Sequence, residues 1–79
     1  MYFIAYKDQN GNDLNGLPWI EPVNTNEERI ELPMALAVKK SFSDIFQTVV
    51  LFKADVENMP EEVTWEFVER HKINENDRV

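Results

Sequence analysis

The side chains that could support catalysis in this chain are few and lie far apart. The only imidazole belongs to His71, and the available hydroxyls include those of Ser41 and Ser43, both within a predicted helix. Nucleophilic catalysis needs a nucleophile with a base beside it, and no motif brings His71 to a hydroxyl. We interpret its neighbours Glu69 and Glu75 as ordinary surface carboxylates. The sequence therefore predicts a protein without catalytic residues, and an enzyme or metal-dependent binder built on His71 is the weakest functional hypothesis.

A candidate calcium loop fails on its spacing. Asp8, Asn10 and Asn12 match the first, third and fifth ligands of an EF-hand loop, but Asp13 stands where glycine is needed and Trp19 where the final glutamate is needed. We interpret these residues as turn formers. The chain has no cysteine for a disulfide or thiolate site, and its glycines lack a phosphate-binding context. The sequence predicts neither a metal nor a cofactor.

The overall charge narrows the class of partner. Fifteen acidic residues stand against eight basic ones in 79 residues, for a net charge of −7. Such a charge repels nucleic acid and anionic lipid, and no apolar run approaches the ~20 residues of a membrane span. We therefore expect a cytoplasmic protein that binds neither nucleic acid nor membrane. A basic protein partner fits the charge, although solubility alone would also explain it.

One segment, residues 55–69, contains only acidic charges. Its carboxylates are candidate partner-binding residues: Asp55, Glu57, Glu61, Glu62, Glu66 and Glu69. As a strand, the segment would hold Glu62 and Glu66 about 13 Å apart at ~3.3 Å per residue, several-fold too sparse to imitate DNA, in which each strand carries one phosphate per ~3.4 Å. The alternative is that these acids only keep an edge strand soluble.

The centre of the chain predicts one helix followed directly by one strand. Met34, Val38, Phe42 and Ile45 recur at helical spacing and should form the buried face of a helix over residues 33–46, which Pro33 either begins or kinks; we favour the first. Residues 47–55 then alternate as an apolar strand that we expect to be central.

Two further strands are predicted at the amino end. Residues 1–8 are apolar on both sides, which is typical of a strand that is covered on both faces. Residues 17–23 form a short strand whose prolines, Pro18 and Pro22, place it at an edge. Of the turn dipeptides between them, Asn10-Gly11 and Asn15-Gly16, one is expected to make the hairpin.

The segment 61–72 is ambiguous. A helix is conceivable, with Asn58 as its cap, but Val63, Trp65 and Phe67 alternate with polar residues, and this alternation favours a strand. A capping box at Thr25 and Glu28 suggests a short helical turn before the main helix.

These elements predict a small α+β domain of order ββαββ. Residues 1–73 form one domain with an antiparallel or mixed sheet and one amphipathic helix on one face, and 74–79 form a flexible polar tail. A single helix would leave part of the sheet open. Tyr2, Tyr6 and Trp19 are therefore candidate anchors for a partner.

The leading hypothesis is a small acidic, non-enzymatic module that binds a partner protein and blocks or modulates it. The expected partner is a basic or nucleic-acid-binding protein, which would make the chain an inhibitor of the phage type or a partial nucleic-acid mimic. The alternative is a structural or assembly protein that self-associates, as a homodimer, through its first or second strand.

Overall fold

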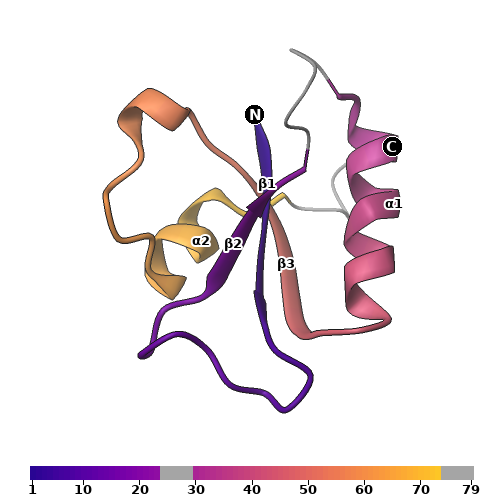
Figure 1. Ribbon diagram of the computed structural model, residues 1–79. Helices are drawn as coiled ribbons and strands as arrows, with labels where there is room; N and C mark the ends of the chain where they lie inside the picture. Colours follow the sequence, from indigo (N-terminus) through magenta and orange to yellow (C-terminus); the bar gives the residue numbers. More distant parts are fainter. Residues whose placement is uncertain (24–29, 74–79) are drawn as a thin grey trace.

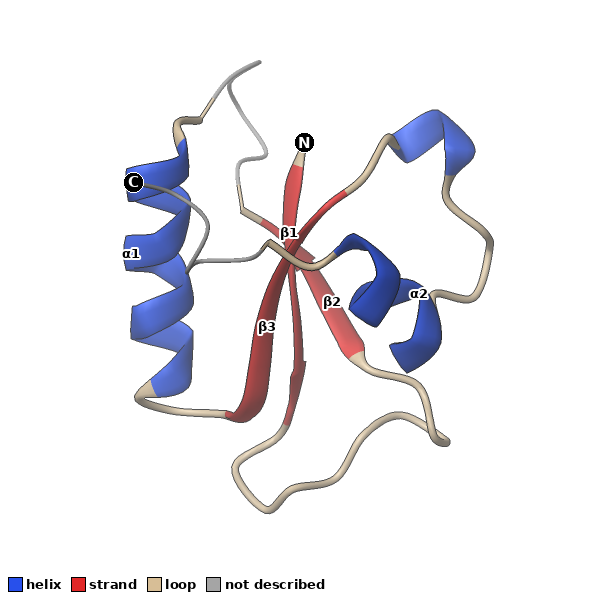
Figure 2. Cartoon of the chain, turned by 180° about the vertical axis from the view of Figure 1, so that it is seen from behind, coloured by secondary structure: helices blue, strands red, loops and turns tan. Residues whose placement is uncertain are grey.

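The sheet of this protein lies between two helices (Figures 1 and 2). The computed structural model describes residues 1–23 and 30–73. Along the chain the elements are β1 (Tyr2–Lys7), β2 (Trp19–Pro22), α1 (Leu32–Ser43), β3 (Gln47–Lys53), the 3-10 turn η1 (Val56–Asn58) and α2 (Trp65–His71). The predicted capping box at Thr25 and Glu28 and the predicted tail at 74–79 lie outside the described residues. Neither described helix combines the length and the apolar character that crossing a membrane requires.

The three strands are antiparallel and follow the order β2-β1-β3. β1 lies in the middle, and its four residues from Phe3 to Tyr6 are all buried, so the prediction of a strand covered on both faces is confirmed. β2 is an edge strand, as its prolines predicted. The prediction that the strand after the main helix would be central is wrong, because β3 pairs with β1 on one side only.

Each face of the sheet carries its own apolar cluster. On one face, Ile4 and Leu51 are buried together with Ala35 of α1. On the other, Phe3 stacks on Phe52 with ring centroids 5.5 Å apart, and Val68 of α2 covers them. The expectation of a single helix that leaves part of the sheet open is therefore wrong.

Residues 61–72 do not form the fourth strand that their alternation favoured. The chain is irregular up to Thr64 and then forms α2, so the order is ββαβ followed by a second helix instead of ββαββ. A helix starting from Asn58 is also wrong, because Thr64 is the N-cap: its hydroxyl accepts a hydrogen bond from the backbone N–H of Phe67 at 3.1 Å. A fourth strand would only widen the sheet, whereas a helix buries Phe3 and Phe52 from above.

Two of the four residues predicted to form the buried face of α1 are exposed. Ala35 is fully buried, whereas Met34 and Ile45 are 60% and 58% exposed. Val38 and Phe42, the other predicted residues, do pack against the core. Successive helical residues are rotated by about 100°, and the small side chain of Ala35 lets the helix approach the sheet closely. Because α1 ends at Ser43, Ile45 lies beyond it.

Both predicted turn dipeptides form turns in the loop between β1 and β2. Asn15 and Gly16 have φ angles of 55° and 85° and join Leu14 to Leu17, whose backbones exchange hydrogen bonds of 2.7 and 2.9 Å. This is the two-residue hairpin turn that positive φ favours. Asp8 begins the other turn: its Oδ1 accepts the backbone N–H groups of Asn10 and Asn12 at 2.9 and 2.8 Å.

Candidate functional site

The three aromatic residues proposed as anchors lie on the α1 side of the sheet, but they differ in exposure. Tyr6 is only 9% exposed, and its ring packs against Phe42 and Phe46 at centroid distances of 5.3 and 4.6 Å. Tyr2 is half-buried beneath the ammonium of Lys53, 5.5 Å from its ring centroid. Trp19, on the edge strand β2, is 40% exposed. Of the three, only Trp19 presents a large surface to a partner.

The environment of Tyr6 also changes its ionisation. Burial of the phenol, followed by the charge of Glu21 on the neighbouring strand, raises its pKa above the ordinary 10.0. A raised pKa is expected of a phenol that belongs to the core.

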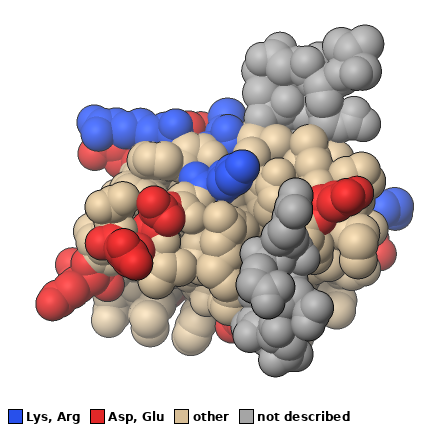
Figure 3. Space-filling view, turned by 90° about the horizontal axis from the view of Figure 1, so that it is seen from above, with Lys and Arg blue, Asp and Glu red and all other residues tan. Residues whose placement is uncertain are grey.

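The candidate carboxylates all lie on the surface, and we call them the acidic surface. They come from the end of β3, η1, the connection that follows it and α2: Asp55, Glu57, Glu61, Glu62, Glu66 and Glu69. In Figure 3, which shares its left and right with Figure 1, carboxylates gather on the left, the side of η1 and α2.

Ion pairs divide the acidic surface into two parts. On α2, Glu66 pairs with Arg70 at 3.2 Å, and Glu69 pairs with Lys72 at 3.1 Å. In contrast, Glu57, Glu61 and Glu62 have no ion-pair partner within residues 1–23 and 30–73. The uncompensated charge is thus concentrated on η1 and the connection to α2.

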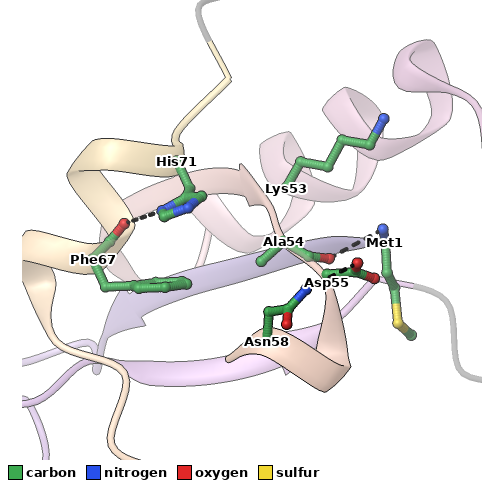
Figure 4. Close-up of a pocket in the computed structure, with 7 residues that line it drawn as sticks. All are labelled: Met1, Lys53, Ala54, Asp55, Asn58, Phe67 and His71. Atoms are coloured by element: carbon green, nitrogen blue, oxygen red, sulfur yellow. Dashed lines mark hydrogen bonds between the residues drawn. The ribbon is translucent and has the colours of Figure 1, made fainter. Parts of the chain in front are cut away.

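A pocket of about 510 Å³ opens beside η1 (Figure 4). One wall is made by the rings of Phe67 and His71 of α2, which stack with centroids 4.2 Å apart and an angle of 22° between their planes. The other is made by Ala54, Asp55 and Asn58, at the end of β3 and in η1. Two stretches of chain, one that runs from β3 into η1 and one that forms α2, therefore meet here.

The imidazole of His71 lines the pocket together with a carboxylate and two amino groups. The Nδ1 of His71 lies 2.9 Å from the carbonyl oxygen of Phe67, so this ring nitrogen is engaged in α2. No serine or threonine is among the residues that line the pocket. Glu69, a predicted neighbour of His71, is paired with Lys72, and Glu75 lies outside the described residues. Within the described ranges, no three His, Asp or Glu side chains lie close enough to hold a metal ion.

No family model, curated protein or solved structure matches this chain.

The sequence contains only a faint signal for the pocket. Phe67 and His71 are four residues apart, a spacing that brings two side chains together on a helix but not on a strand. The alternation of this segment instead favours a strand, on which side chains four residues apart do not meet. The charge of Asp55 marks it as a surface residue and Asn58 is marked as a possible helix cap, but neither signal indicates a pocket.

Proposed function

We propose that this protein is a non-enzymatic binding module that attaches to a basic surface of another protein and blocks or modulates it. The observation that carries the proposal is the group formed by Glu57, Glu61 and Glu62, which are exposed and have no cationic partner in the part of the chain that the structure describes. Uncompensated charge of one sign speeds encounter with a surface of the opposite sign.

A basic protein surface suits this arrangement better than the role of a nucleic-acid mimic. A helix of seven residues, such as α2, is about 10.5 Å long, a length over which each strand of a DNA duplex carries about three phosphates. α2 carries only Glu66 and Glu69 over that length, and both are neutralised by ion pairs. We therefore propose charge-guided protein binding and do not propose imitation of a duplex.

The test is the rate of association with the partner. Proteins captured by the immobilised chain from cells of its native host would be purified, and their association would be followed by stopped-flow fluorescence at low and physiological ionic strength. We expect the on-rate to fall about tenfold or more as salt rises, because screening removes the attraction at long range. A triple variant, Glu57→Gln with Glu61→Gln and Glu62→Gln, should bind more slowly and with a weaker salt dependence.

The matched control removes three charges from other parts of the surface. Glu21, Glu31 and Asp44 are exposed and lie in or beside β2 and α1. Glu21→Gln with Glu31→Gln and Asp44→Asn alters the net charge by the same amount. An association rate that does not depend on ionic strength, or an equal reduction of that rate by the two triple variants, would contradict the proposal.

A further inference from the structure

The aromatic wall of the pocket packs against the core through Phe67. The ring of Phe67 meets the fully buried Phe52 edge to face, with centroids 6.2 Å apart and an angle of 87° between the planes. His71 then stacks on Phe67 and remains largely exposed (Figure 4). A fixed, accessible aromatic surface is a favourable platform for a flat cationic group.

The opposite wall carries a carboxylate that is open to a cation. Asp55 Oδ2 accepts a hydrogen bond from the Asn58 amide at 3.3 Å, and no cation of the described residues is paired with it. Two cations also line the pocket, and each has another contact. Lys53 extends toward the α1 side, over Tyr2, and the Met1 amino group donates to the Ala54 carbonyl at 3.2 Å (Figure 4).

We propose that the pocket binds an arginine side chain of the basic partner, an inference that rests on the proposed function. The planar guanidinium stacks on the outer face of the His71 ring, the side that Phe67 does not cover, and donates paired hydrogen bonds to Asp55. Lysine matches the charge but not the flat shape of this site. The volume of about 510 Å³ is within the usual range of ligand pockets, and the neighbouring Glu57 adds attraction.

The probe is a capped tetra-arginine peptide, titrated into the full chain and followed by NMR. We expect saturable shifts at Ala54, Asn58, Phe67 and His71, and weaker binding of capped tetra-lysine. Asp55→Asn should weaken tetra-arginine binding about tenfold, the equivalent of 1.4 kcal/mol. Glu21→Gln alters the net charge equally from the other face of the sheet and should leave the affinity unchanged.

A second variant tests the stacking wall. His71→Ala removes an exposed ring and leaves the core residues in place, so the fold should persist, as the amide spectrum would verify. The preference for arginine over lysine should shrink. Equal affinity for the two peptides in the unaltered protein, or equal effects of Asp55→Asn and Glu21→Gln, would overturn the proposal.

These results separate the pocket from the proposed function. Suppose that the protein binds tetra-arginine no more tightly than tetra-lysine, but that the triple variant of Glu57, Glu61 and Glu62 still slows association with the partner. The arginine proposal then fails and the proposed function stands. If the pocket binds arginine as expected but the on-rate ignores salt, the pocket stands and charge-guided association fails.

Discussion

Among single residues, Asp13 and Trp65 make the contact that joins the loop between β1 and β2 to α2. The indole Nε1 of Trp65 donates to Asp13 Oδ2 at 3.1 Å, and the ammonium of Lys7 lies 5.8 Å from the centroid of the Trp65 ring. The indole hydrogen bond holds the pKa of Asp13 below its ordinary value of 3.8, against the opposing effect of desolvation, with help from the backbone N–H of Gly16. The carboxylate form of Asp13 is therefore part of the folded state.

This contact predicts a stability that depends on pH. Because the pKa of Asp13 is lower in the folded than in the unfolded chain, its contribution is fully present above pH 3.8 and disappears as the pH falls through the folded value. Asp13→Asn should thus lower the urea midpoint at pH 6 and differ progressively less from the parent protein below pH 3.8. The measurement is urea unfolding at a series of pH values, followed by circular dichroism.

Two variants check the origin of this pH dependence. Trp65→Phe removes the indole donor, so the urea midpoint of this variant should no longer show the decrease at low pH that is assigned to Asp13. Glu62→Gln removes an exposed carboxylate without an ion-pair partner in the described residues and should keep the parent profile. If the difference between Asp13→Asn and the parent stays constant down to the lowest pH, the assignment to Asp13 fails.

Among the elements, α2 depends most on a local signal, the Thr64 cap. Three to four backbone N–H groups at a helix start have no partner within the helix, and the Thr64 hydroxyl satisfies that of Phe67. A helix of only seven residues has little stability of its own. Its cap and the packing of Val68 therefore hold it in place.

We expect Thr64→Ala to lower the free energy of unfolding by about 1 kcal/mol, the usual effect of losing a hydroxyl cap. Equilibrium urea unfolding measures this change. Thr64→Ser keeps the acceptor and should restore most of the stability. Since α2 also positions Phe67 and His71, Thr64→Ala should weaken binding of tetra-arginine as well. Equal stability of the alanine and serine variants would show that the cap contributes nothing.

Across the whole molecule, the sheet offers little backbone for pairing with another chain. β1, one of the two strands named in the self-association hypothesis, is paired on both sides and cannot join a second copy. Directly after β2, the backbone N–H of Val23 donates to the carbonyl oxygen of Tyr2 on β1. Backbone N–H groups alternate in direction along an antiparallel strand, so the backbone at positions 18, 20 and 22 faces away from β1. Two of these are prolines, which leaves Ile20 as the outward donor.

The other edge of the sheet is partly covered. The N–H of Ile73 donates to the Leu51 carbonyl on the outer side of β3 at 2.9 Å, and Lys72 forms a bridge with Phe52. Proline on one edge and a crossing segment on the other are both known ways of preventing sheets from joining.

We therefore expect the protein to sediment as a monomer over a wide range of concentrations. Pro22→Val restores an outward N–H next to Ile20 and adds a residue that favours strands, so this variant should associate as its concentration rises. The control is Glu21→Val. The backbone N–H of residue 21 already faces β1, so this variant gains the valine side chain but no outward donor and should remain monomeric. A parent protein that dimerises would restore the assembly hypothesis.

Signals carried by neighbouring residues were sufficient for most of the fold. The apolar run of β1, the prolines of β2, the helical spacing of α1 and the alternation of β3 are local patterns, and each produced the predicted element within a few residues. Asn15-Gly16 forms a predicted turn because its positive φ angles suit those two residue types. The exposed acids were also predicted from charge alone.

Tertiary structure decided the features that depend on which surface still has to be covered. Val63, Trp65 and Phe67 suit a strand locally, but the face with Phe3 and Phe52 lacked a cover, and α2 provides it. Packing of α1 on the sheet likewise buries Ala35 and Tyr6 and leaves Met34 exposed. The pocket forms where α2 meets η1. Local patterns describe what a segment can form, whereas the burial of apolar area is a property of the assembled layers.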